Sequence, residues 1–211
     1  MQVLGYLATA IAAYLIGSIP TGFLVARSRG IDIRAVGSGN IGATNAVRTL
    51  GWTAGILVLL VDALKGWLAV VVAAPLIASA FPGGPADYLR ITAGVAVILG
   101  HNFTCWLRFK GGKGVATTGG VLAGLVPWTL LIAAAAWAFG MAATRIVSVG
   151  SLAAAISLPI ATWFTTHHDA GLTIVTGAMG VLAIYKHRQN IRRLLSGTES
   201  RLQFKKKEAA P

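Results

Sequence analysis

The chain has few charged residues, and few of those are acidic. Only 6 of its 211 residues are Asp or Glu, whereas 18 are Lys or Arg, so the formal net charge is +12. Charged residues make up 11% of the chain, against roughly a quarter in soluble domains, and the mean hydropathy is +0.73. This scarcity of charge excludes an ordinary soluble domain and predicts an integral membrane protein.

Cysteine is almost absent as well. The single thiol, Cys105, excludes an internal disulfide, a Cys-x-x-Cys pair and a cysteine-based zinc cluster, so we expect no metal and no cofactor. We expect His167 and His168 to be solvated in a loop, and a metal site beside Asp169 is the less favoured alternative. Nor is there a soluble basic domain or an aromatic platform for bases, which excludes a nucleic-acid partner. The first residues lack the basic start of a cleaved signal peptide and predict a membrane helix.

Hydrophobic runs that approach the length of a bilayer crossing recur along the chain. They cover residues 4–26, 53–80, 91–107, 149–164 and 172–185. A sixth run, 115–143, is interrupted by Pro127, and each of its halves is short for a crossing.

Basic residues lie in three clusters that predict the topology. Four are within residues 27–48, three within 108–113, and eight follow residue 183. The positive-inside rule places all three clusters in the cytoplasm, and the uncharged N-terminus outside. Both termini lie on their predicted sides of the membrane only if residues 115–143 form a helical hairpin broken near Pro127. The alternative, a single span there, would put the basic tail outside.

The predicted fold is therefore an all-α integral membrane protein with seven transmembrane helical segments. Its N-terminus is outside and its C-terminus is in the cytoplasm. We expect one membrane-embedded domain over residues 1–200, followed by a basic cytoplasmic tail over 201–211.

Two polar, glycine-rich stretches interrupt the hydrophobic runs on the predicted cytoplasmic side. Residues 37–45 read Gly-Ser-Gly-Asn-Ile-Gly-Ala-Thr-Asn, and residues 109–118 read Phe-Lys-Gly-Gly-Lys-Gly-Val-Ala-Thr-Thr. Glycines let backbone N–H groups converge, and the neighbouring hydroxyls, amides and lysines suit a phosphate at the membrane surface. The alternative is that these glycines only let turns pass close to neighbouring helices.

The second stretch is not a nucleotide-binding Walker A loop. That pattern requires glycine in place of Leu107 and Ser or Thr in place of Gly114. We interpret it as a loop that opens a helix, where free N–H groups and Lys113 can bind an anion.

Other polar residues lie in or beside the apolar runs. Asp62 and Lys65 share one face of a predicted span, and because unpaired charges there are costly, we expect a structural ion pair; a direct functional role is the alternative. His187 and Asn190 also share a face and are predicted site residues, whereas Arg192 and Arg193 are interpreted as topology anchors. His101 is either catalytic or a packed residue at a helix end.

Three motifs, in this order, resemble those of the bacterial acyl-phosphate:glycerol-3-phosphate acyltransferases of the membrane PlsY type. The first comprises residues 17–22, 32–34 and 37–45, the second Gly100 and His101 with 109–117, and the third His187, Arg188, Asn190, Ile191, Leu194, Gly197 and Glu199. The resemblance covers nearly the whole chain. One departure, Asn-Phe-Thr-Cys at 102–105 where many members are closer to Phe-Pro-Val, puts in question only the local path of the chain after His101.

The resemblance implies transfer of a fatty acyl group from acyl phosphate to the sn-1 hydroxyl of glycerol 3-phosphate. The products are lysophosphatidic acid and inorganic phosphate, in the first step of bacterial phospholipid synthesis. It further implies seven membrane helices in the bacterial inner membrane and an active site facing the cytoplasm. The expected partners are the two substrates and membrane lipids, and we expect a monomer.

Residue roles follow from the same resemblance. Catalytic roles are implied for Ser38, Arg48, His187 and Asn190. Phosphate contacts are implied for a larger set: Gly39, Asn40, Thr44, Asn45, Gly111, Gly112, Lys113, Gly114 and Ser148. Glu199 matches a glutamate regarded as structural.

The chemistry can also be argued from the residues themselves. An acyl phosphate is an activated anhydride, so orienting the two substrates and stabilising the developing charge suffice for catalysis. The sequence also shows no recognisable Ser-His-Asp arrangement. We therefore expect direct transfer, in which the donor phosphate or His187 accepts the hydroxyl proton. An anion transporter is the rival hypothesis, but the polar motifs all fall on one predicted side, whereas a permeation path needs polar residues toward both.

Overall fold

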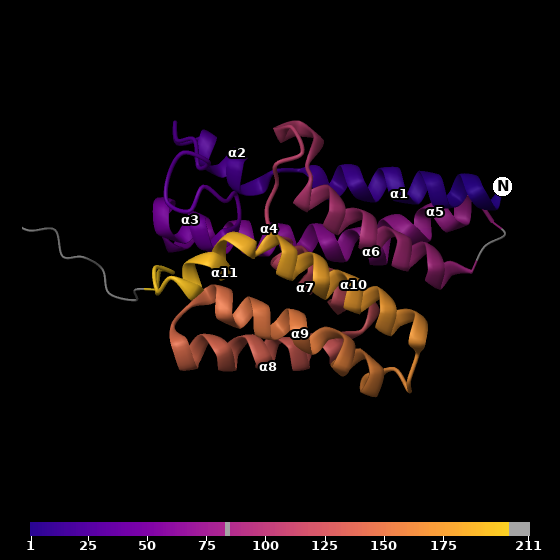
Figure 1. Ribbon diagram of the computed structural model, residues 1–211. Helices are drawn as coiled ribbons and strands as arrows, with labels where there is room; N and C mark the ends of the chain where they lie inside the picture. Colours follow the sequence, from indigo (N-terminus) through magenta and orange to yellow (C-terminus); the bar gives the residue numbers. More distant parts are fainter. Residues whose placement is uncertain (83–84, 203–211) are drawn as a thin grey trace, which may run out of the picture.

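The computed structural model describes residues 1–82 and 85–202, and its regular elements in those ranges are all helices (Figure 1). This confirms the predicted all-α class for the described residues. The elements are α1 (Gln2–Ser18), α2 (Thr21–Arg27), α3 (Ala43–Leu50), α4 (Trp52–Leu68), a π-helical segment (Ala69–Ala73), α5 (Ala74–Ala80), α6 (Ala86–Asn102), a 3₁₀ turn (Cys105–Leu107), α7 (Val115–Leu125), α8 (Pro127–Thr144), α9 (Val147–Thr165), α10 (Ala170–Lys186) and α11 (Arg188–Leu195). Most of the predicted tail, including the lysines at 205–207, lies outside the described residues.

Four helical stretches are long and apolar enough to cross a membrane. They are Gln2–Arg27, Trp52–Ala80, Pro127–Thr144 and Val147–Thr165, and the shorter α7 and α10 are also apolar. Large apolar side chains such as Leu60, Phe139 and Ile174 point outward on these helices, as is typical of a lipid-facing surface. The number of crossings and their orientation stay predictions.

Two predicted spans have different boundaries in the structure. The run 4–26 is divided between α1 and α2 at Pro20, which has no backbone N–H to continue the helix. The run 91–107 begins earlier and ends at Asn102, because Phe103 leaves the helical conformation and Arg108 and Phe109 have positive φ angles. Hydropathy alone could not locate these irregular turns.

The chain breaks at Pro127, as predicted, and reverses there. Helix α7 ends at Leu125 and α8 begins at Pro127, with Val126 between them in a non-helical conformation. The outer ends of this hairpin lie close together, because Lys113 before α7 and Ser148 after α8 are joined by hydrogen bonds through Asn190 and Glu199. The N-terminus lies at the opposite end of the molecule from α11 (Figure 1).

Helices α4 and α7 approach each other closely through glycines. A Cβ atom on Gly120 would lie 1.8 Å from the carbonyl oxygen of Ala63, and one on Gly66 would lie 2.3 Å from that of Thr117. The two backbones therefore touch where a side chain would separate them. This crossing fixes the start of α7, and with it the second glycine-rich stretch, against α4.

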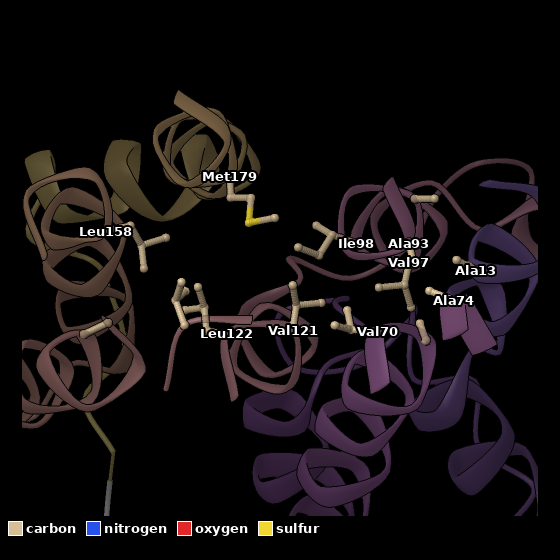
Figure 2. Packing of buried hydrophobic residues seen from close by; sticks show 14 residues of the cluster. Ala13, Val70, Ala74, Ala93, Val97, Ile98, Val121, Leu122, Leu158 and Met179 are labelled. Carbon is tan, nitrogen blue, oxygen red and sulfur yellow. The ribbon is translucent and has the colours of Figure 1, made fainter. Parts of the chain in front are cut away.

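A group formed by α8, α9 and α10 packs beside the rest of the bundle, with α7 between the two parts (Figure 1). Buried apolar side chains line the junction. Figure 2 shows Leu158 of α9 and Met179 of α10 directed toward Leu122 of α7 and Ile98 of α6. The core therefore seals one end of the junction, and the cavity described below occupies the other.

Candidate active site

The first glycine-rich stretch is organised around the side chain of Asn45, which is 2% exposed. Its Oδ1 accepts a hydrogen bond from the backbone N–H of Ser38 at 2.9 Å. Its Nδ2 donates to the carbonyl oxygens of Ile33, Val36 and Asn40 at 3.2, 3.1 and 2.9 Å. The amide of Asn45 is thus fully used in holding the loop.

Ser38 is presented at the tip of this loop. The glycines on either side, Gly37 and Gly39, have φ angles of +60° and +69°, a conformation that other residues rarely adopt. A Cβ atom on Gly37 would also lie 2.2 Å from Oδ1 of Asn45. Glycine is therefore required here for the loop to close over Asn45 and expose the serine.

The second glycine-rich stretch folds against the C-terminal end of α6. Gly111 N donates to Asn102 O at 3.2 Å, and Gly112 N donates to His101 O at 3.0 Å. A Cβ atom on Gly112 would lie 2.1 Å from Nε2 of His101, so the loop rests directly on the imidazole. This contact aligns the loop with the start of α7 and holds Lys113 in place.

Lys113 is the first member of a chain of polar contacts that converges on Glu199. Lys113 Nζ donates to Asn190 Oδ1 at 2.5 Å, and Asn190 Nδ2 donates to Glu199 Oε1 at 2.5 Å. Ser148 Oγ donates to the same Glu199 oxygen at 2.8 Å, and Arg193 Nε donates to Oε2 at 2.6 Å. Two residues remote in sequence are therefore linked to one carboxylate, Ser148 directly and Lys113 through Asn190.

Burial and charge shift the pKa values of the groups in this network. Burial lowers the pKa of Lys113 to about 8, with Arg193 and Arg48 acting in the same direction and Glu199 opposing them. Burial raises the pKa of Glu199, but hydrogen bonds from Asn190, Arg193 and Ser148 outweigh it, so the net shift is downward. The carboxylate is therefore ionised at neutral pH, and the Lys113 ammonium is close to its titration range.

His187 is held as a neutral ring, and it lines the larger of the two cavities described below. The side chain is 2% exposed, and burial together with the charge of Lys113 lowers its pKa to about 4. Its Nδ1 lies 2.8 Å from the carbonyl oxygen of Ala183. Since a carbonyl oxygen can only accept, Nδ1 carries the hydrogen and Nε2 is left as an acceptor.

Arg48, on α3, reaches the same region from the other side. Its guanidinium donates to the carbonyl oxygen of Ser200 at 3.1 Å, next to Glu199. The contact joins the first glycine-rich stretch to the segment that follows α11.

Asp62 and Lys65 form the predicted ion pair and also contact His101. Asp62 Oδ1 accepts from Lys65 Nζ at 2.7 Å and from Thr21 Oγ1 at 2.9 Å. Lys65 Nζ also contacts His101 Nδ1 at 3.0 Å and donates to the carbonyl oxygen of Ile19 at 3.0 Å, where α1 ends. The pair thus links the break between α1 and α2 to the histidine on which the glycine loop rests.

Two cavities meet at these residues. The larger, of about 700 Å³, is polar at the end that holds His187 and Glu199 and apolar between α4, α7, α8 and α9. The smaller, of about 280 Å³, is lined by five basic side chains: Lys110, Lys113, Lys186, Arg188 and Arg193. Four residues line both cavities: Ser38, Asn40, Lys113 and Asn190. An apolar compartment therefore adjoins a cationic one at the serine, the lysine and the amides.

The structure brings the predicted site residues together. The four assigned to catalysis, Ser38, Arg48, His187 and Asn190, all line the larger cavity. Those assigned to phosphate contacts fall into three groups: Asn40, Thr44, Asn45, Lys113, Gly114 and Ser148 line the larger cavity, Gly39 and Gly111 line the smaller, and Gly112 lines neither. Their roles stay predictions, and the engaged amide of Asn45 fits a loop-holding role at least as well.

Sequence reasoning missed the part played by Arg193, which we interpreted as a topology anchor. The structure pairs it with Glu199 across the turn at Gly197, whose φ is +70°. The isolated acidic residue among many basic ones was a usable signal, since a carboxylate there attracts a cation. Sequence reasoning also missed Lys186, whose Nζ donates to the carbonyl oxygen of Asn102 at 2.7 Å. The same oxygen accepts from Gly111 of the glycine loop.

Within residues 1–82 and 85–202, no three His, Cys, Asp or Glu side chains are grouped as a metal site would require. His167 and His168 are exposed, and the ring of His168 packs edge-on against Trp163 with centroids 4.8 Å apart.

Comparison with known proteins gives one consistent result. A family model described as glycerol-3-phosphate acyltransferase matches residues 7–197. A glycerol-3-phosphate acyltransferase of Geobacter sulfurreducens is 49% identical over 90% of this chain and 93% of its own length, and one of Chlorobaculum tepidum is 42% identical over 97% and 99%. The fold is similar to the crystal structure of PlsY, an integral membrane glycerol 3-phosphate acyltransferase, in its glycerol 3-phosphate form: the TM-score is 0.83 and the identity 38%, over 94% of this chain and 96% of that one. Its lysophosphatidic acid form matches with a TM-score of 0.80 and 36% identity, over 94% and 95%.

Proposed function

Because this chain belongs to the glycerol-3-phosphate acyltransferase family, we propose that it transfers a fatty acyl group from an acyl phosphate to the sn-1 hydroxyl of glycerol 3-phosphate. The products are lysophosphatidic acid and inorganic phosphate. The observation that carries the proposal is the junction of an apolar and a cationic cavity at Ser38, Lys113 and Asn190. One substrate is a lipid, the other a small anion, and their reacting groups must meet.

Each cavity suits one substrate. The cationic cavity, with five basic side chains, fits the phosphate of glycerol 3-phosphate. The apolar part of the larger cavity fits the fatty chain of the donor, and its polar end fits the acyl phosphate group. The resemblance found from the motifs and the forms in which the similar PlsY structures were solved, with glycerol 3-phosphate and with lysophosphatidic acid, support this division.

The proposed reaction is a direct displacement. The hydroxyl oxygen of glycerol 3-phosphate attacks the acyl carbonyl carbon, a new ester C–O bond forms, and the C–O bond to the donor phosphate breaks. The hydroxyl proton passes to the departing phosphate or to Nε2 of His187, which its contact with Ala183 leaves as an acceptor. The bonds and the proton of this reaction are accounted for without an oxidant, a metal or a covalent acyl-enzyme.

Four groups stabilise the charge that develops. Lys113 and Arg48 neutralise the substrate phosphates, and Ser38 and Asn190 orient them by hydrogen bonding. An anion beside Lys113 favours the charged ammonium and offsets the burial that lowers its pKa to about 8. Because the buried ammonium is poorly solvated, it gains more from contact with an incoming phosphate than an exposed lysine does.

Other residues hold these four in place. Glu199 fixes the side chains of Asn190 and Ser148, so we assign it a positioning role. Asp62, Lys65 and His101 brace the glycine loop through the contact of His101 with Gly112. This favours a structural role over a catalytic one for all three.

The proposed setting is the bacterial inner membrane, with the site on the cytoplasmic side and the chain acting as a monomer. Clustered Lys and Arg around the site support the orientation, which we propose together with the seven transmembrane segments.

The test is release of inorganic phosphate by the purified protein given palmitoyl phosphate and glycerol 3-phosphate. We expect release that needs both substrates and yields lysophosphatidic acid. Ser38→Ala and Lys113→Ala should reduce it by at least roughly a hundredfold. Ser79→Ala, at an exposed serine of α5 bonded only within its own helix, is the matched control and should be unaffected.

A parallel reaction with palmitoyl-CoA distinguishes the donors. Product from the thioester but not from the acyl phosphate would overturn the proposed donor while leaving the acyltransferase. Absence of product from either donor with well-folded protein would overturn the activity itself.

A further inference from the structure

Three leucines, on three of the four helices that line its apolar part, lie at the end of the larger cavity away from the polar network. Leu122 lies near the end of α7, Leu130 in the first turn of α8, and Leu158 on α9, and all three line the cavity. We propose that these residues form a floor, here called the leucine floor, that limits the length of the fatty chain the enzyme accepts. The inference rests on the proposed function and adds a determinant of donor choice to it.

The depth of the cavity follows from the helices that line it. Along α9, ten residues separate Ser148 in the polar network from Leu158 at the floor, and both line the cavity. At a rise of 1.5 Å per residue this distance is about 15 Å. A fatty chain that starts beside Ser148 therefore meets Leu158 before it reaches the far end of α9.

The leucine floor is held rigid by the side chains that pack behind it. Leu122 and Leu158 are 2% and 4% exposed and belong to the buried apolar cluster, where Met179 packs close to them (Figure 2). Just beyond Leu130 and Leu158, the hydroxyls of Thr129 and Thr165 are 2.8 Å apart, which ties the start of α8 to the end of α9. A longer chain therefore cannot push the floor away without breaking packed contacts.

Small residues line part of the cavity on the three helices that carry the floor, beside larger side chains such as Trp67 and Trp137, and they leave space for a chain. Ala123, Ala134 and Ala155 line the cavity on α7, α8 and α9. Ala123 and Ala134 are also exposed, so the cavity opens outward between α7 and α8. This opening lets a lipid donor enter from the bilayer, and it also defines the rival arrangement, in which the end of the chain leaves sideways and its length is not sensed.

The test is a competition among donors of different length. Wild-type protein receives an equimolar mixture of acyl phosphates with 12, 14, 16 and 18 carbons together with glycerol 3-phosphate, and the lysophosphatidic acids are quantified by mass spectrometry. A product ratio within one reaction does not depend on how much of the protein is folded, so a partly unstable variant remains informative.

Variants should move the ratio in opposite directions. Leu158→Ala removes side-chain volume at the floor and should raise the share of the longest product relative to 14 carbons by roughly tenfold, the effect of a methylene in an apolar pocket. Ala134→Leu adds volume to the wall and should favour the shorter products by a similar factor. Ile156→Ala, on the same helix but 59% exposed, is the control and should leave the ratio unchanged.

One result would count against the inference alone, and a different one would count against the proposed function. Unchanged product ratios in Leu158→Ala and Ala134→Leu, with normal total turnover, would show that the chain end leaves sideways between α7 and α8. Absence of any lysophosphatidic acid from wild-type protein would instead overturn the activity on which the floor depends.

Discussion

Glu199 is the residue on which the polar side of the site is assembled. It accepts hydrogen bonds from Asn190, Ser148 and Arg193, although its own segment has no regular secondary structure. An ionised carboxylate can serve three donors, whereas an amide or a methyl group cannot. The position of Asn190, and through it that of Lys113, therefore depends on one side chain.

We expect Glu199→Ala to lower kcat by about 10- to 100-fold, as is typical when a group that orients a site residue is lost. Glu199→Gln keeps one acceptor oxygen for Asn190 and should lose less. The measurement is steady-state phosphate release, with the KM for glycerol 3-phosphate determined separately. Equal losses in both variants would mean that the charge, rather than the hydrogen bond to Asn190, is what matters.

The pKa values of Lys113 and His187 predict how kcat/KM depends on pH. Both lie below their usual values, Lys113 at about 8 and His187 at about 4. The charged lysine is needed to bind phosphate, so kcat/KM should fall as pH rises through about 8. The neutral imidazole is needed as an acceptor, so the acid limb for His187 should appear only near pH 4.

Lys113→Arg isolates the alkaline limb. A guanidinium stays charged throughout the accessible range, so the fall near pH 8 should move upward or disappear, even if the maximum is lower. Phosphate release corrected for spontaneous hydrolysis of the donor provides the measurement. An unchanged alkaline limb would assign that titration to another group.

Residue types at the site could be predicted from the motifs, but their partners could not. Ser38 and Lys113 were identifiable because glycines surround them in patterns that suit an anion. The four hydrogen bonds of Asn45 within its loop, and the pairing of Arg193 with Glu199, depend on the path of the backbone through positive-φ turns, which composition does not specify.

At the scale of the helices, the crossing of α4 and α7 decides where the second glycine-rich stretch lies. Gly119 and Gly120 are neighbours on α7 with opposite surroundings. A Cβ on Gly120 would lie 1.8 Å from a backbone oxygen of α4, whereas one on Gly119 would meet nothing closer than 3.9 Å. One glycine is required by packing, and the other is not.

Alanine at these two positions should therefore have opposite effects on stability. Gly120→Ala forces α4 and α7 apart and should cost about 1–3 kcal/mol, a fall in Tm of several degrees. Gly119→Ala should be neutral or stabilising by up to about 1 kcal/mol, because alanine is the better helix former. Thermal unfolding in detergent measures both, and a lower Tm for Gly119→Ala than for Gly120→Ala would contradict the assigned crossing.

Helix positions followed from hydropathy in α4, α9 and α10, even though Asp62 and Lys65 lie within α4 and Pro159 within α9. The break at Pro127 was also predictable, because the basic clusters require residues 115–143 to begin and finish on one side, and proline disfavours a continuous helix. The early end of α6 was not, since the residues at 103–107 are apolar enough to extend the run. Their irregular path is set instead by the glycine loop that packs against Asn102 and His101.

At the scale of the whole molecule, the orientation in the membrane decides which substrates can reach the site. Helix α11 lies at the end of the bundle opposite the N-terminus (Figure 1). It carries Asn190 and Arg193 of the polar network, and both residues line the smaller cavity. Positive charge is concentrated at the same end, which predicts that it faces the cytoplasm. Glycerol 3-phosphate would then enter directly from the cytoplasm, while the donor enters from the bilayer.

Labelling of single cysteines tests this orientation. In a Cys105→Ala background, Asp87→Cys places a thiol at a side chain that is 88% exposed at the start of α6, and Ser196→Cys places one after α11. An impermeant maleimide applied to intact spheroplasts should label position 87 and should reach position 196 only after permeabilisation. An even number of crossings between the two sites, as a single span over 115–143 would give, predicts instead that both are labelled from outside. That outcome would place the tail, and with it Lys113, Asn190 and Glu199, on the side where no cytoplasmic glycerol 3-phosphate is available, and it would be incompatible with the proposed reaction.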